Sequence, residues 1–303
     1  MQKTSRNFFL FLSQNKTLNK SAKRWGFNLG AAKVVAGESI ESAMDTVLSL
    51  NHKGILAAVD HLGEFVSSEQ EAKEAAEHCL RTLEAVDRCG ADCYLSLKLT
   101  QLGIDIDREL CFQFMKEILE KAASLELFVR IDMEDYAHCQ PTLDMLKRLR
   151  KEYDNVGTVI QAYLYRASDD IDDLKGVPLR LVKGAYKESD AVAWQDKKQI
   201  DANFLNIIKQ HLTNGSYTAI ATHDHRIIEE VKNFTAEAGI PADQFEFQML
   251  YGFRTDMQEA LAQEGYRFRT YVPFGNDWYS YFMRRLAERP QNVSFAFKGM
   301  FSK

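Results

Sequence analysis

Short apolar segments that alternate with helix-like segments constrain the fold of this chain more than any other feature of its sequence. Eight of the apolar segments have the length and the polar boundaries that are typical of a buried strand. They are Ile55–Val59, Cys93–Leu99, Phe128–Asp132, Thr158–Ala162, Arg180–Lys183, Thr218–Thr222, Phe245–Leu250 and Arg267–Val272. Strands that alternate with helices pair in parallel, because each helix returns the chain to the same end of the sheet.

The segments between these strands have helical periodicity. Two of them carry an apolar stripe at the spacing i, i+3, i+4, i+7, i+8, which buries one helix face against a sheet. The stripes are Ile40, Ala43, Met44, Val47 and Leu48, and Cys111, Phe114, Met115, Ile118 and Leu119. Ser68, three residues before Glu71, predicts a helix start, and Gly90, Gly176 and Gly239 lie where helices should end.

Eight such units in 303 residues without a linker or low-complexity segment favour a closed (β/α)8 barrel, a TIM barrel, over an open doubly wound sheet. We expect a single domain over residues 1–303, with N-terminal helices in 1–53, the barrel in 54–303 and a last helix over the barrel mouth. No GxGxxG motif follows any strand, so nothing supports a dinucleotide-binding Rossmann unit.

Composition narrows the possible partners. The net charge of −5 and the lack of a basic stripe argue against a nucleic-acid binder. The five cysteines lack metal-ligand spacing, so free thiols in the cytoplasm and no metal site are expected. The apolar run 8–12 is too short for a secretory signal, and no stretch could form a transmembrane segment. The start of the chain is either an amphipathic helix packed on the body or a surface that docks on a membrane.

In (β/α)8 barrels the functional residues lie at the carboxyl ends of the strands and in the loops that follow. The sequence places a mostly ionisable ring of side chains at these positions. The ring comprises Asp60, His61, Gly63, Glu64, Lys98, Asp132, Met133, Glu134, Gln161, Lys183, Gly184, Ala185, Tyr186, Thr222, His223, Asp224, Gln248 and Tyr271.

Three strand-associated charges have both a functional and a structural interpretation. Lys98 either pairs with Asp132, at the end of the neighbouring strand, or extends into water. Asp132 could instead cap the following helix. Arg180, at the start of its strand, is either a surface residue or points into the barrel, where a planar polar ligand would be its acceptor.

The last segment, from Tyr279 to Asn292, predicts a helix after the final strand. Tyr281, Arg284, Arg285 and Glu288 share one face of it. Two adjacent guanidinium groups beside an aromatic ring suit a carboxylate ligand, although a solvated run of charges is the alternative.

The segment 281–289, YFMRRLAER, resembles the YxxRRLxER signature of the proline dehydrogenase family. Further blocks resemble the same family in the same order. They are Leu97–Leu99, Arg130–Glu134, Gln161–Leu164, Arg180–Tyr186, Ala221–His223 and Tyr271–Pro273. The resemblance spans residues 55–300 and is to the short monofunctional bacterial form, which lacks the aldehyde dehydrogenase half of some relatives.

The resemblance implies an FAD-dependent oxidation of L-proline to Δ1-pyrroline-5-carboxylate by hydride transfer to flavin N5, as the first step of proline catabolism to glutamate. A membrane quinone would reoxidise the flavin, and a pyrroline-5-carboxylate dehydrogenase would act downstream. We therefore expect a cytoplasmic enzyme, peripheral on the inner face of the membrane.

The family motifs also imply a role for each matching residue. The substrate-binding residues would be Lys98, Arg284, Arg285, Tyr271 and Tyr186, and the catalytic residues Asp132 and Arg180. FAD would bind to Met133, Gln161, Arg180, Lys183, Gly184, Ala185, Thr222 and His223. Glu288 would orient the arginine pair, and Glu64 would close the site.

Two other functions are compatible with the same residues. A Schiff-base aldolase could use Lys98 or Lys183 as its nucleophile. A non-catalytic scaffold could bind an acidic partner through Arg284 and Arg285, but it would not need the strand-end charges.

Overall fold

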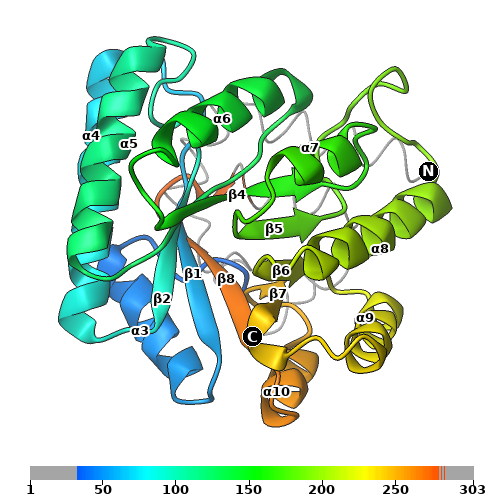
Figure 1. Cartoon of the computed structure of the whole chain (residues 1–303). Coiled ribbons are helices and arrows are strands. Elements are labelled where there is room, and N and C mark those ends of the chain that lie inside the picture. The colour runs from blue at the N-terminus through cyan, green and yellow to red at the C-terminus, as the bar shows by residue number, and fades with distance from the viewer. Residues whose placement is uncertain (1–32, 280, 282, 284–303) are drawn as a thin grey trace.

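A closed barrel of eight parallel strands forms the centre of the molecule (Figure 1). The computed structural model describes residues 33–279, 281 and 283. The strands follow chain order around the barrel, and β8 pairs with β1. They are β1 (Leu56–His61), β2 (Cys93–Leu97), β3 (Val129–Ile131), β4 (Val156–Gln161), β5 (Leu179–Val182), β6 (Thr218–Ala221), β7 (Phe245–Leu250) and β8 (Phe268–Phe274). The predicted (β/α)8 fold is confirmed, and every predicted strand is present.

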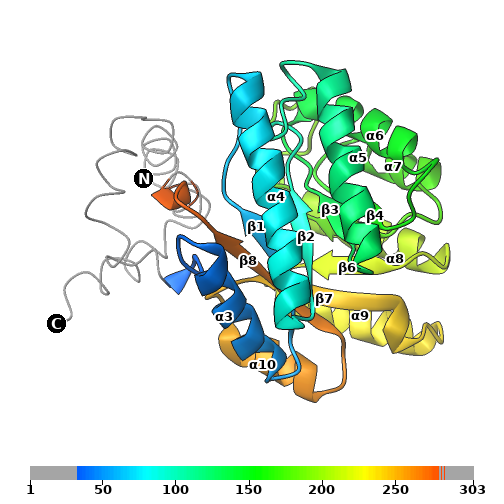
Figure 2. The ribbon, with the colours of Figure 1, turned by 90° about the vertical axis from the view of Figure 1, so that its left-hand side faces the viewer.

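Helices form a layer around the barrel (Figure 1). They are α3 (Ile40–Asn51), α4 (Glu69–Cys89), α5 (Arg108–Ser124), α6 (Tyr136–Leu149), α7 (Ala167–Asp173), α8 (Lys197–Thr213), α9 (His225–Glu237) and α10 (Thr255–Gln263), with a 3-10 turn at Ala242–Gln244. Helix α3 precedes the first strand and packs outside β1 and β8, beside α4 (Figure 2).

Local sequence signals account for the positions of these helices. All five residues of the predicted stripe in α5 are buried, and in α3 Ala43, Met44 and Val47 are buried. Ser68 caps α4 by accepting a hydrogen bond from the Glu71 amide, and Gly90 ends that helix with a φ of 61°. The apolar stripes therefore hold the helical layer on the barrel.

The strand register brings the candidate site residues together. Leu97 at the end of β2 pairs with Ile131 at the end of β3. Lys98 and Asp132 are thus the first residues after two adjacent strands, and the Asp132 amide donates to the Leu97 carbonyl at 2.8 Å. Lys98 and Asp132 were predicted to lie within the strands. The regular strand pairing ends at Leu97 and Ile131, one residue before each of them.

Parts of the predicted terminal segments lie outside the described residues. These parts include residues 1–32 and the site residues Arg284, Arg285 and Glu288. At the start of the last helix, Trp278, Tyr279, Tyr281 and Met283 are helical. All five cysteines are free. Within the described part of the chain, every helix is too short or too polar to cross a membrane.

Candidate active site

A cavity of about 630 Å³ opens at the carboxyl ends of the strands. Its volume lies within the range of about 300–1,000 Å³ that is usual for small-molecule and cofactor sites. Every described residue to which the family motifs assign a role lines this cavity, whereas His61, Gly63 and Glu134 of the predicted ring do not. The residues with an assigned role are Glu64, Lys98, Asp132, Met133, Gln161, Arg180, Lys183, Gly184, Ala185, Tyr186, Thr222, His223 and Tyr271.

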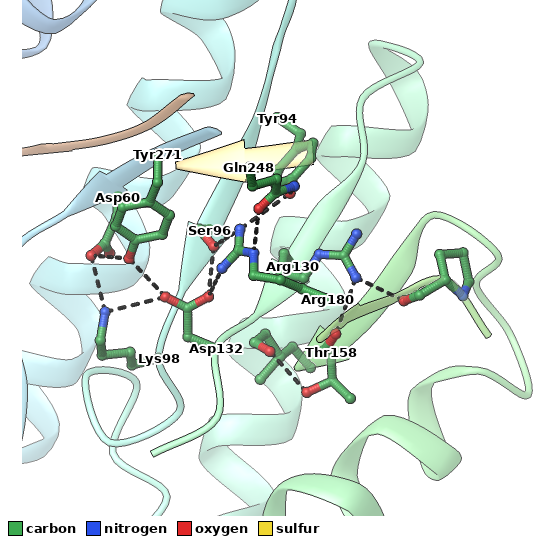
Figure 3. Close-up of polar contacts among 12 residues, drawn as sticks. Asp60, Tyr94, Ser96, Lys98, Arg130, Asp132, Thr158, Arg180, Gln248 and Tyr271 are labelled. Atoms are coloured by element: carbon green, nitrogen blue, oxygen red, sulfur yellow. Dashed lines mark hydrogen bonds and ion pairs between the residues drawn. The ribbon is translucent and has the colours of Figure 1, made fainter. Parts of the chain in front are cut away.

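Lys98 lies between two buried carboxylates at the floor of the cavity (Figure 3). Its Nζ donates to Asp60 Oδ2 at 3.0 Å and to Asp132 Oδ2 at 3.5 Å. The predicted pairing with Asp132 is therefore confirmed, but Asp60 is the nearer partner. Tyr271 Oη lies 2.6 Å from Asp60 Oδ2 and 2.7 Å from Asp132 Oδ2, so the two carboxylates share one phenol proton.

These contacts determine the charges of the cluster. Burial alone would lower the pKa of Lys98, but Asp60 and Asp132 hold that pKa well above its ordinary value. For the carboxyl group of Asp132, burial alone would raise the pKa, but the positive charges of Arg180 and Lys98 keep that pKa below its usual range. Burial raises the pKa of Asp60 despite the attraction of Lys98. Lys98 is therefore a firmly protonated ammonium group.

A protonated lysine cannot act as the nucleophile of a Schiff-base aldolase, because that reaction needs a free amine. The second candidate nucleophile, Lys183, is also paired with carboxylates: its Nζ lies 2.5 Å from Asp201 Oδ1 and 3.3 Å from Asp224 Oδ2. Asp201 and Asp224 are also partners of Lys197, so both candidate lysines belong to ion-pair clusters. The geometry therefore argues against the aldolase.

Arg180 points into the barrel, as one of its two interpretations predicted (Figure 3). Its Nη1 donates to Asp132 Oδ1 at 2.7 Å and its Nε to Gln248 Oε1 at 2.7 Å. Its Nη2 donates to Tyr94 Oη at 3.1 Å and to Ser96 Oγ at 3.3 Å. Arg180 therefore has acceptors within the protein, and its contact with a planar ligand stays a prediction. Asp132 does not cap a helix, since Asp135 is the N-cap of α6.

Several polar residues of the barrel interior were missed by the sequence analysis. They are Tyr94, Ser96, Arg130, Glu246 and Arg269, and all five are buried. Tyr94 and Ser96 accept hydrogen bonds from Arg180, and Glu246 accepts one from Gln248. Arg130 and Arg269 lie against the ring of Tyr94. A period of two could have revealed them, because side chains two apart in a strand share one face. The pairs are Tyr94 and Ser96, Arg130 and Asp132, Glu246 and Gln248, and Arg269 and Tyr271.

The family resemblance implies that Gly184, in the loop after β5, lets the backbone come close to the cofactor. Its packing gives a second reason for a glycine there. In the structure a Cβ at Gly184 would lie 2.3 Å from the ring of Tyr163, and its φ is +111°. The packing of Tyr163 and the backbone conformation therefore require this glycine, which still lines the cavity.

On the β6 side of the cavity, side chains brace the loops. The Leu250 amide lies 3.2 Å from His223 Nε2, and the Asp224 amide donates to Thr222 Oγ1 at 3.1 Å. Asp224 in turn caps α9 by accepting from the Arg226 amide. Opposite them, Gln161 Nε2 donates to the Glu134 carbonyl at 2.8 Å. These contacts fix the walls of a preformed cavity.

Comparison with known proteins identifies the family. The family model described as proline dehydrogenase matches residues 43–298 of this chain. The chain belongs to the proline dehydrogenase family. Members of this family are flavin-dependent oxidoreductases of proline catabolism, so the resemblance seen in the sequence motifs is confirmed.

Relatives of this proline dehydrogenase family member match it over almost its whole length. It is 52% identical to "Proline dehydrogenase 1" of Bacillus subtilis subsp. natto, covering 98% of this chain and 99% of the relative. It is 43% identical to "Proline dehydrogenase" of Deinococcus radiodurans, covering 97% of each. Proline utilization A from Bdellovibrio bacteriovorus, inactivated by N-propargylglycine, matches 93% of this chain with a TM-score of 0.82 and 25% identity. The match covers 35% of that longer chain.

Proposed function

We propose that this protein oxidises L-proline to Δ1-pyrroline-5-carboxylate with FAD as cofactor and a membrane quinone as final electron acceptor. One observation carries the proposal beyond family membership. The described residues that the family motifs assign to substrate and cofactor all line a single cavity at the carboxyl ends of the strands.

The cavity suits FAD by the chemistry of its walls. Apolar side chains of Met133, Val182 and Leu250 offer surface to a flat ring system, and Arg180 and Lys183 offer positive charge. The start of α9 adds main-chain donors, which favour phosphate groups at a helix N-terminus. Residues that would hold FAD are Met133, Gln161, Arg180, Lys183, Gly184, Ala185, Thr222 and His223. Bound FAD supplies the two-electron acceptor that protein side chains lack.

Lys98, Arg284 and Arg285 would bind the carboxylate of proline, while Tyr271 and Tyr186 would bound its ring. A guanidinium fork binds a carboxylate through two parallel hydrogen bonds, which fixes the direction of the substrate as well as its position. Holding the substrate in one orientation replaces a diffusional encounter by a positioned one. Glu288 would orient the two arginines, and Glu64 would close the site.

The amine of proline must also lose its proton before the C–N bond can be oxidised. Positive charge near an amine favours its neutral form. Lys98 supplies such charge, because Asp60 and Asp132 keep it protonated. Asp132 would then serve catalysis by holding Lys98 and Arg180 at once.

The remaining assignments follow from the same reaction. The enzyme would be cytoplasmic and attach peripherally to the inner face of the membrane, where it would meet the quinone acceptor. A pyrroline-5-carboxylate dehydrogenase would consume the product on the route to glutamate. The domain would be a single barrel over 54–303 with N-terminal helices in 1–53.

The visible spectrum of the purified protein tests this function directly. We expect the absorption bands of an oxidised flavin, and we expect them to bleach when L-proline is added without oxygen. Extraction should release FAD rather than FMN. D-proline is the matched control, because its carboxylate and reacting hydrogen cannot both take the positions of those in the L-isomer.

Two results would contradict the proposal. A flavin spectrum that L-proline does not bleach would reject the substrate. A protein that stays colourless after incubation with FAD would reject the cofactor.

A further inference from the structure

Tyr94 is buried inside the barrel, beside Arg180 (Figure 3). Two further arginines, Arg130 and Arg269, lie against its ring. Arg180 Nη2 donates to Tyr94 Oη at 3.1 Å. The guanidinium carbons of Arg269 and Arg130 lie 4.3 Å and 5.5 Å from the centre of the Tyr94 ring. The phenol is 5% exposed, so water does not screen these charges.

The orientation of Gln248 determines how it contacts Tyr94. Its Oε1 accepts a hydrogen bond from Arg180 Nε at 2.7 Å, and its Nε2 donates to the Glu246 carboxylate. In the reverse orientation, the NH2 group of Gln248 would face a guanidinium donor and its oxygen would face a carboxylate, so neither hydrogen bond could form. Gln248 Nε2 therefore also donates to Tyr94 Oη, at 2.9 Å.

The Tyr94 oxygen thus accepts two hydrogen bonds, one from Arg180 and one from Gln248. Within the described residues, no hydrogen-bond acceptor is found for the proton of the Tyr94 hydroxyl. Two donors and no acceptor are the surroundings that stabilise the ionised form of an acid.

The charges buried in the barrel point the same way. The buried charged side chains on the strands, or directly after them, are the cations Lys98, Arg130, Arg180 and Arg269 and the carboxylates Asp60, Asp132 and Glu246. A further buried carboxylate, Glu134, follows β3 and acts on Lys98. Three of the cations, Arg130, Arg180 and Arg269, meet at Tyr94.

We infer that Tyr94 ionises in the folded protein and that the resulting phenolate is a positioning residue, which holds Arg180 from below while Asp132 holds it from the mouth. The part concerning catalysis rests on the proposed function, in which Arg180 faces the cofactor. In the ionisation step the O–H bond of Tyr94 breaks, its electron pair stays on the phenolate oxygen, and the proton goes to solvent.

The groups around Tyr94 act in both directions. Burial opposes its ionisation, and so does Glu246 on β7, while Arg180 on β5, Arg130 on β3 and Arg269 on β8 favour it. The net effect lowers the pKa of Tyr94 below its ordinary value.

Carbon-13 NMR of the flavin-bound protein, labelled at the tyrosine ring carbon that bears oxygen, tests the ionisation. Tyr94→Phe assigns one of the twelve tyrosine signals. We expect that signal to reach the phenolate position at a lower pH than the signals of the exposed tyrosines. If Tyr94→Phe does not fold, Gln248→Met identifies the same signal, because losing one donor should raise its midpoint. A Tyr94 signal that titrates with the exposed tyrosines would overturn the inference.

Reduction kinetics test the positioning. Tyr94→Phe should slow flavin reduction by L-proline about tenfold, because Arg180 loses a charged hydrogen bond, and should leave the proline KM unchanged. In the wild type, the rate of flavin reduction should rise with pH as Tyr94 ionises. This rise should be absent from Tyr94→Phe. Tyr153→Phe, whose hydroxyl bonds only the exposed Glu120, is the control.

The possible outcomes separate the two proposals. An ionised Tyr94 in a protein that L-proline does not reduce would contradict the proposed function and leave the ionisation standing. Reduction at the wild-type rate and pH profile in Tyr94→Phe would contradict the positioning role alone.

Discussion

Asp132 is the residue at which the buried charges of the site converge. One oxygen accepts from Arg180 and Ser96, and the other contacts Lys98 and Tyr271. Replacing one member of a buried ion pair leaves an uncompensated charge, which is costlier than losing the pair as a whole. Asp132 therefore maintains the structure of the site as well as its charge.

Asp132→Asn should lower the free energy of unfolding at neutral pH by about 3 kcal/mol, because two buried cations lose a carboxylate. Flavin reduction by L-proline should slow as well, since both cations lose their fixed positions. Urea denaturation and stopped-flow absorbance measure the two effects. The matched control is Asp105→Asn on the surface, where Asp105 pairs with His138. Equal stability of both variants and the wild type would contradict this role.

Helix α8 shows how a single buried group ties a helix to the barrel. His211 of α8 is fully buried. Its Nδ1 lies 2.7 Å from Thr218 Oγ1 of β6, and its Nε2 lies 3.2 Å from the Val177 carbonyl. Burial lowers the pKa of His211 to about 4 from an ordinary value of 6.5. The attachment of α8 therefore depends on a neutral imidazole.

The lowered pKa of His211 in α8 predicts that the stability of the folded protein depends on pH. The unfolded chain takes up a proton at His211 near pH 6.5, whereas the folded chain does so only near pH 4. Protons in that window favour the unfolded state, so stability falls as the pH falls from 6.5 to 4, by up to about 3 kcal/mol from this group. Urea denaturation across this range should show a shallower decline for His211→Gln than for the wild type. Exposed His52→Gln controls for the loss of an imidazole, and parallel curves for His211→Gln and the wild type would refute the prediction.

The whole molecule combines a fixed barrel with a cavity at one end. Strand pairing runs around the barrel without a break, and the cavity walls are held by hydrogen bonds within the protein. A ligand that binds such a preformed site stabilises the folded state without having to order it first.

Removing the flavin should therefore lower the thermal stability of the whole protein, and adding FAD back should restore it. At about a hundredfold excess over its Kd, FAD should raise the free energy of unfolding by about 2.7 kcal/mol. Thermal denaturation of stripped and reloaded protein measures this difference. FMN lacks the adenosine part of FAD, which the family resemblance places near Thr222 and His223, so FMN should stabilise the protein less. Identical melting of the stripped protein with and without FAD would count against the cofactor assignment.

The amino-acid sequence by itself determined the elements and the end of the barrel where the site lies. Strand and helix periodicity, the Ser68 cap and the stripe of α5 are local, because each depends on residues only a few positions apart. Lys98 and Asp132 were predictable as neighbours, since the carboxyl ends of adjacent parallel strands meet. The family motifs add the reaction, but their residues Arg284, Arg285 and Glu288 lie outside the described part of the chain.

Only the tertiary structure decided which side chains share each charge. The second carboxylate on Lys98 comes from β1, and Arg180 is held by Tyr94 and Gln248 from β2 and β7. The glycine at position 184 is required by the ring of Tyr163, on the loop after β4. These contacts join residues far apart in the chain, and they depend on strand register and barrel closure. No local pattern encodes that register, because it results from the packing of all eight strands at once.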